Sequence, residues 1–108
     1  MKGVAVARYV DLYPKLGYFF GAYFHQDWVD SGSFENVVHE FLGENPAATI
    51  RQATRELEAF LGLALSDDEL HDIVVDDLGA NVRAAGMGLT YRQWLEAVLL
   101  VLKKAAPN

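Results

Sequence analysis

The sequence predicts an all-α protein folded as a single compact bundle of about five helices. Apolar residues recur every three or four positions in successive segments, which places them on one face of a helix and does not fit strand alternation. Several segments begin with residues that cap a helix. The 108 residues are 52% hydrophobic and contain no repeat or linker, so we expect one domain over residues 1–108, in which about two-thirds of the unfolded surface is buried.

The amino-terminal residues, 1–10, are expected to be attached to this domain only loosely. Residues 1–8 carry an apolar run that is too short for a signal peptide and is interrupted by Arg8. This run fits either a short strand or the frayed start of a helix. No stretch approaches the 18 or so apolar residues of a membrane span. We therefore expect a cytoplasmic protein that does not bind membranes.

The first strong helix runs into residues 23–28. Its apolar residues keep the one-faced spacing: Leu16, Phe19, Phe20, Tyr23 and Phe24. Pro14 suits the first turn, where its missing N–H costs nothing. Gly17 and Gly21 lie four residues apart, so they leave a strip without side chains where another backbone can approach closely.

The second and third helices follow after a turn. Ser33 is predicted to cap the second helix and Gly43 to end it; its apolar residues are Phe34, Val37, Val38, Phe41 and Leu42. Asn45 is predicted to cap the third helix, with Pro46 in its first position. The apolar side of the third helix is Ile50, Ala53, Leu57, Phe60 and Leu61. Its remaining charged residues are predicted to be solvated surface, with Arg55 and Glu58 paired; these are Arg51, Arg55, Glu56 and Glu58.

The fourth and fifth helices start at two capping boxes. Ser66 and Glu69 form the first, and Thr90 and Gln93 form the second. The inward residues of the fourth helix, which ends at Gly79, are Leu70, Ile73, Val74 and Leu78. Residues 80–89 are predicted to be a loop or a broken turn. The last helix is expected to close the core against the first, through Trp94, Leu95, Val98, Leu99 and Leu102.

The net charge of −6 is concentrated in the fourth helix. We name six of its acidic residues the acidic segment: Asp67, Asp68, Glu69, Asp72, Asp76 and Asp77. The other nine acidic residues balance the nine Lys and Arg of the chain. This charge disfavours nucleic acid as a ligand and favours a cationic partner.

Part of the acidic segment opposes the local stability of its helix. Asp68, Asp72 and Asp76 are spaced to form an outward stripe, and Asp76 and Asp77 lie near the negative carboxyl end of the helix dipole. Such residues suggest a functional reason, here a surface that binds a basic partner. A merely solvated face is the alternative.

Residues 23–28, Tyr-Phe-His-Gln-Asp-Trp, allow two interpretations. In the first, Tyr23, Phe24 and Trp28 are core aromatics, and Asp27 caps a turn or hydrogen-bonds a backbone amide near the helix end. In the second, His25 is a general base oriented by Asp27, as in a hydrolase. The chain has no Cys, no pair of His at metal-ligand spacing and no glycine-rich nucleophile turn. The first interpretation is therefore preferred, and we expect neither cofactor nor metal.

The order of these motifs resembles the CdiI-type immunity proteins of bacterial contact-dependent growth inhibition systems. The resemblance is carried by residues 16–28, 35–42, 57–61 and 88–95. The most specific part is the Tyr-Phe-His-Gln-Asp-Trp block. The residues before Asp11 lie outside the pattern, and residues 80–87 lack the aromatic residues typical of that place.

The resemblance implies a non-enzymatic protein that neutralises the carboxyl-terminal toxin domain of a cognate CdiA effector. Many such toxins are nucleases, which need a basic surface to hold their substrate. We expect the acidic segment to cover that surface, with apolar anchors in residues 80–87. The family motif is expected to be mainly structural: Tyr23, Phe24, His25, Gln26, Asp27, Trp28 and Trp94. An adaptor for another basic protein is the alternative from a different class.

Overall fold

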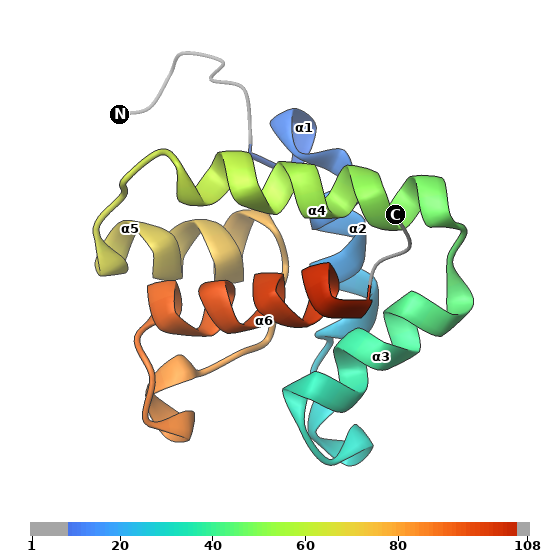
Figure 1. Cartoon of the computed structure of the whole chain (residues 1–108). Coiled ribbons are helices and arrows are strands. Elements are labelled where there is room, and N and C mark those ends of the chain that lie inside the picture. Colours follow the sequence, from blue (N-terminus) through green and yellow to red (C-terminus); the bar gives the residue numbers. More distant parts are fainter. Residues whose placement is uncertain (1–8, 106–108) are drawn as a thin grey trace.

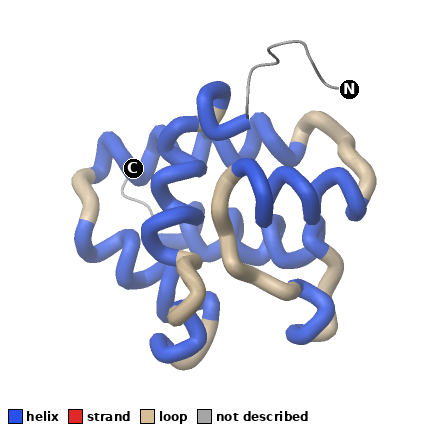
Figure 2. The backbone as a smooth tube through the Cα atoms, turned by 180° about the vertical axis from the view of Figure 1, so that it is seen from behind, coloured by secondary structure: helices blue, strands red, loops and turns tan. Residues whose placement is uncertain are grey.

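The computed structural model describes residues 9–105, which fold as the predicted all-α bundle. Its α-helices are α1 (Tyr9–Leu12), α2 (Pro14–Tyr23), α3 (Phe34–Glu44), α4 (Ala47–Leu61), α5 (Asp67–Asp72) and α6 (Tyr91–Ala105). Two 3₁₀ segments, η1 (Trp28–Ser31) and η3 (Ala84–Met87), and one π-helical segment, η2 (Ile73–Asp77), complete it. Figure 2 shows no strand in the described residues. None of the helices in residues 9–105 is long and apolar enough to cross a membrane.

The two longest helices, α4 and α6, lie side by side and form the body of the molecule (Figure 1). Helix α5 packs beside α6, α2 packs on α4, and α3 lies against α6 and α2. The last helix thus packs mainly on α4 and α3. Its predicted contact with the first strong helix is made by Trp94, whose ring centre lies 5.5 Å from that of Phe20 and 5.1 Å from that of Phe24.

The core is aromatic where α2, α3 and α6 meet. Phe19 and Phe41 stack with ring centres 4.2 Å apart, and Trp94 is fully buried. The predicted apolar faces are buried or half-buried in every helix. Packing of these faces therefore holds the bundle together, since each buried large side chain contributes about 1.5 to 3 kcal/mol.

The glycine strip of α2 admits close neighbours, as predicted. A Cβ built on Gly17 would lie 2.6 Å from Cγ2 of Val10, and one built on Gly79 would lie 3.7 Å from the Cα of Gly21. Tyr9 packs on α4, with its ring centre 6.0 Å from that of Phe60. Tyr9 and Val10 thus belong to the segment that we expected to be loosely attached. The rest of that segment, residues 1–8, lies outside the described residues.

Three helix starts are confirmed, and two boundaries near residue 45 are wrong. Ser33 caps α3, and both capping boxes are present. Gly43 lies inside α3, which continues to Glu44. Asn45 ends α3 by donating from Nδ2 to the carbonyl oxygen of Phe41, 3.0 Å away. Pro46 precedes α4 with an extended backbone, at φ −68° and ψ 156°, so Asn45 cannot cap that helix.

The predicted surface of α4 needs two corrections. Glu56 is buried, because its Oε1 accepts a 2.9 Å hydrogen bond from the backbone N–H of Leu16 in α2. Glu58 pairs with Lys103 of α6 and not with Arg55. Both carboxylates therefore connect α4 to a neighbouring helix, which local spacing could not indicate.

Candidate functional site

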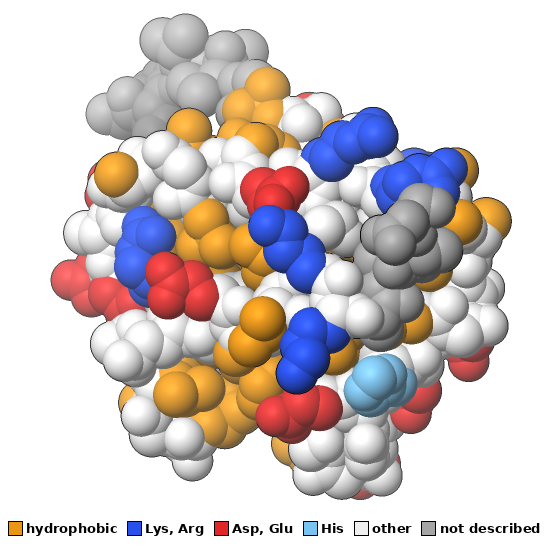
Figure 3. Space-filling model, viewed as in Figure 1, with side chains coloured by type: hydrophobic (Ala, Val, Ile, Leu, Met, Phe, Trp, Pro, Cys, Tyr) orange, Lys and Arg blue, Asp and Glu red, His pale blue; other side chains and the backbone are white. Residues whose placement is uncertain are grey.

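The predicted outward stripe of the acidic segment is exposed. Asp68, Asp72 and Asp76 all lie on the surface, although the helix widens to a π-turn at η2, where the N–H of Leu78 donates to the carbonyl oxygen of Ile73 over 2.8 Å. Acidic side chains gather at the left edge of Figure 3, beside the amino end of α5. The predicted exposure of these three carboxylates is therefore confirmed.

Three other members of the acidic segment bind backbone N–H groups of the fold. Asp67 Oδ1 accepts from Arg92 N at 3.2 Å, in the first turn of α6. Glu69 completes the capping box at Ser66, over 2.9 Å. Asp77 Oδ2 accepts from Tyr9 N at 3.0 Å, at the start of α1. Asp77 therefore has a structural reason to lie near the carboxyl end of its helix, and the dipole argument for a functional role now rests on Asp76.

The remaining acidic residues differ in their contacts. Asp72 Oδ1 lies 2.9 Å from His71 Nδ1. Asp68 and Asp76 form no side-chain hydrogen bond or ion pair with any residue in the part of the chain described. These two carboxylates are the ones most readily available to a partner.

The motif block 23–28 divides into a buried and an exposed half. Phe24 is fully buried, and Tyr23 and Trp28 are half-buried against the core. His25, Gln26 and Asp27 are exposed. His25 Nδ1 accepts a hydrogen bond from the backbone N–H of Asp27 at 3.1 Å, and the Asp27 side chain does not cap η1. Three residues of the block thus pack against the core and three face solvent, and a mainly structural role for the whole block stays a prediction.

This arrangement does not support the hydrolase interpretation. The bond between His25 and Asp27 uses the backbone of Asp27, so the carboxylate does not orient the imidazole. A general base in a triad needs such an orienting partner on its second nitrogen. Among residues 9–105 there is also no group of three or more His, Asp or Glu that could hold a metal ion.

The hydroxyl of Tyr23 connects α2 to the end of α3 through two hydrogen bonds. Its hydroxyl donates to Glu44 Oε1 at 2.8 Å and accepts from Asn45 Nδ2 at 3.0 Å. Burial of the phenol, followed by its hydrogen bond to Glu44, raises the pKa of Tyr23 well above its usual range. Tyr18 joins this network through Asn45 Oδ1, 3.1 Å away. The network fixes the corner before α4 without forming an evident reaction centre.

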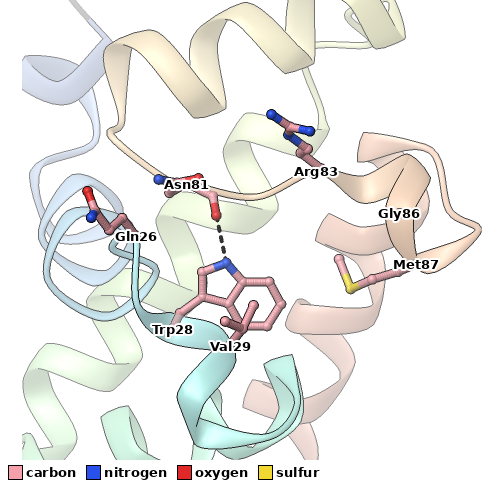
Figure 4. Close-up of a pocket in the computed structure, with 7 residues that line it drawn as sticks. All are labelled: Gln26, Trp28, Val29, Asn81, Arg83, Gly86 and Met87. Atoms are coloured by element: carbon pink, nitrogen blue, oxygen red, sulfur yellow. Dashed lines mark hydrogen bonds between the residues drawn. The ribbon is translucent and has the colours of Figure 1, made fainter.

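A pocket of about 310 Å³ opens between the corner after α2 and the loop before α6. We name it the Trp28 pocket, and its lining residues are Gln26, Trp28, Val29, Asn81, Arg83, Gly86 and Met87 (Figure 4). Trp28 Nε1 donates to the carbonyl oxygen of Asn81 at 2.6 Å, which joins the two walls. Sequence reasoning missed this pocket because its walls are separated by more than 50 positions in the chain.

The anchors expected in residues 80–87 are mostly core residues. Ala80, Val82 and Ala84 are buried, so they cannot contact a partner. Only Met87, which is half-buried, faces the Trp28 pocket among the larger apolar residues of this loop. In the sequence, apolar and polar residues alternate from position 80 to position 84. This alternation could have indicated that one side of the loop lies against the core.

Comparisons with known proteins agree with the resemblance noted in the sequence. Residues 12–101 match the family described as CdiI immunity protein. The chain is also similar to a chain in the crystal structure of a CdiA-CT/CdiI complex from Y. kristensenii 33638. Identity to that chain is 26%, the TM-score is 0.76, and the match covers 83% of this chain and 97% of the other. No curated protein matches. Because the family match spans most of the chain, including the motif block, the acidic segment and most of α6, this protein belongs to the CdiI immunity protein family.

Proposed function

We propose that this protein binds the carboxyl-terminal toxin domain of a cognate CdiA effector in the cytoplasm and neutralises it without catalysis. The observation that carries the proposal is the similarity to a chain of a CdiA-CT/CdiI complex, at a TM-score of 0.76 over 97% of that chain. Membership of the CdiI immunity protein family supports it.

The toxin, in this proposal, is a nuclease whose basic active-site surface is covered by the acidic segment. An enzyme that acts on nucleic acid needs cationic side chains to hold phosphates. Asp68 and Asp76 are exposed and without side-chain partners among residues 9–105, so they can bind toxin Lys or Arg without breaking a contact of the fold. Asp72 adds a third exposed carboxylate beside them.

Two of the bound carboxylates also contribute to recognition through their charge. Asp67 and Glu69 accept hydrogen bonds from backbone N–H groups, which are neutral donors and do not cancel a full negative charge. Together with Asp68, Asp72 and Asp76 they attract a cationic toxin from a distance. Steering of this kind raises association rates by roughly tenfold to a thousandfold at low salt.

The test is titration calorimetry with the CdiA toxin domain encoded beside this chain, at two salt concentrations. The variant changes Asp68, Asp72 and Asp76 together to Asn. The matched control changes Asp30 to Asn and Glu35 and Glu96 to Gln, which removes three charges from exposed positions elsewhere. We expect tight wild-type binding that weakens in salt, and a smaller salt dependence in the first variant than in the control.

Two results would contradict the proposal at different levels. Equal affinity and salt dependence in both variants would show that the acidic segment is only a solvated face. No binding of wild type to the toxin domain would contradict neutralisation itself and favour an adaptor for another basic protein.

A further inference from the structure

The Trp28 pocket is held open by hydrogen bonds that do not need a partner. Besides the bond from Trp28 Nε1, the backbone N–H of Asn81 donates to the carbonyl oxygen of Phe24 at 2.7 Å. The Trp28 ring also meets Phe24 edge-on, with ring centres 5.6 Å apart. Since its N–H is already satisfied, the indole offers the pocket a fixed apolar surface. A preformed pocket of this kind lowers the entropic cost of binding.

Apolar surface is left uncovered at this pocket. Val29 is 60% exposed, the largest exposed fraction among the exposed large hydrophobic residues described. It lies beside the half-buried Trp28, and Met87 faces both from the opposite wall (Figure 4). Hydrophobic side chains also gather at the lower left of Figure 3, over η3. Interface hot spots are enriched in Trp and Arg and cluster in well-packed pockets from which water is excluded.

Arg83 supplies the charge of the pocket. Its side chain is exposed and forms no ion pair with any residue from 9 to 105. In a protein whose net charge is −6, this leaves an unpaired cation at the edge of the pocket, with its guanidinium directed away from Trp28 and Met87 (Figure 4). The complementary group is therefore a carboxylate, next to an apolar side chain that can fill the pocket.

We propose that the Trp28 pocket is the docking site for a loop of the CdiA toxin domain that presents an apolar side chain followed or preceded by an Asp or Glu. The apolar side chain packs against Trp28, Val29 and Met87, and the carboxylate pairs with Arg83. This inference rests on the proposed function, and it adds a second contact of opposite polarity to the acidic segment. Two contacts of opposite charge on one protein specify a single binding register, because a misplaced partner meets like charges.

The pocket can be filled without disturbing the fold. A Cβ at Gly86 would meet nothing within 4 Å, and the backbone φ of Gly86 is not positive. The same holds for Gly43, at an exposed position of α3. Because Gly86 lines the pocket, we expect Gly86→Leu to narrow it, and Gly43→Leu is the matched control. Arg83→Glu is paired in the same way with Arg51→Glu, which reverses an exposed charge on α4.

The experiment measures the Kd of each variant for the CdiA toxin domain by calorimetry, with thermal midpoints as a check of folding. We expect Gly86→Leu and Arg83→Glu to weaken binding at least about tenfold, and both controls to stay within about twofold of wild type. Sedimentation of the free proteins shows whether the pocket instead binds a second copy of this chain.

The outcomes separate this inference from the proposed function. Tight wild-type binding that neither pocket variant weakens would overturn the docking site alone. A wild-type dimer that Gly86→Leu dissociates, with toxin affinity unchanged, would assign the pocket to self-association and also overturn it. If wild type does not bind the toxin domain at all, the proposed function fails and the docking site fails with it.

Discussion

Glu56 of α4 caps α2 through Leu16, with 2.9 Å between Oε1 and the backbone nitrogen. The carboxylate is only 6% exposed and also accepts from Gln52 Nε2, at 2.8 Å. Tyr13, which precedes α2, offers no side-chain cap. Glu56, which is distant in the chain, therefore satisfies a backbone N–H that a local capping residue would usually satisfy. The positive amino end of the helix dipole also stabilises the negative charge of this carboxylate.

Removing this contact is expected to destabilise the protein. Glu56→Ala leaves the N–H of Leu16 buried without an acceptor, which costs about 1 to 3 kcal/mol. Urea unfolding of the variant measures the loss. Glu58→Ala, which removes an exposed ion pair with Lys103, is the control and is expected to cost about 1 kcal/mol or less. Equal losses in the two variants would contradict the capping role.

Gly79 and Gly43 are expected to respond in opposite directions to the same substitution. Gly79 has φ of +80°, and its Cβ would lie 3.7 Å from the Cα of Gly21, so Gly79→Ala should cost about 1 to 2 kcal/mol from the left-handed backbone alone. Gly43 lies inside α3 with open space around it, so Gly43→Ala should stabilise by about 0.5 to 1 kcal/mol. Thermal midpoints that shift in the same direction would contradict this prediction.

Asp77 and Asp76 are adjacent but should behave differently. Asp77→Ala removes the acceptor for Tyr9 N, and we expect a loss of about 1 kcal/mol or more. Asp76→Asn removes an exposed charge near the carboxyl end of the helix, so stability should stay equal or rise by a few tenths of a kcal/mol. Denaturant unfolding of both variants measures these two changes in the free energy of unfolding. A larger loss at Asp76 would show that its carboxylate has a structural role.

The stability of the fold is expected to decrease as the pH rises above the usual pKa of a tyrosine phenol, near 10. Burial raises the pKa of both Tyr23 and Tyr91 in the folded protein, whereas in the unfolded chain a phenol ionises near pH 10. Above about pH 10 the unfolded chain has therefore lost protons that the folded chain still holds, which favours unfolding. The double variant Tyr23→Phe and Tyr91→Phe should flatten this fall in urea titrations across that range. If the free energy of unfolding of the double variant fell with pH as steeply as that of wild type, Tyr23 and Tyr91 would not be the cause of the fall.

Short-range signals in the sequence were sufficient for most of the helices. The capping boxes at Ser66 and Thr90 join residues three positions apart, so one local turn contains the whole interaction. The apolar stripes likewise depend only on the helical period. The errors near residue 45 arose because Asn45 suits both the end of one helix and the start of the next, and the choice depends on its bond to Phe41.

The candidate site was predictable only in part. The exposure of Asp68, Asp72 and Asp76 followed from helical spacing, because outward positions on a packed helix face solvent. The structural use of Asp77 did not follow, since its partner Tyr9 lies 68 positions away. Whether the acidic segment binds a toxin stays a prediction of the charge pattern.

By itself the sequence determined the helical class, the main helix starts and the place of the excess negative charge, all of which depend on residues within about one turn of each other. Only the tertiary structure decided that Glu56 is buried and that Trp28 and Arg83 line one pocket. These facts depend on contacts between segments distant in the chain. Their geometry is set by how whole helices pack, which no local pattern records.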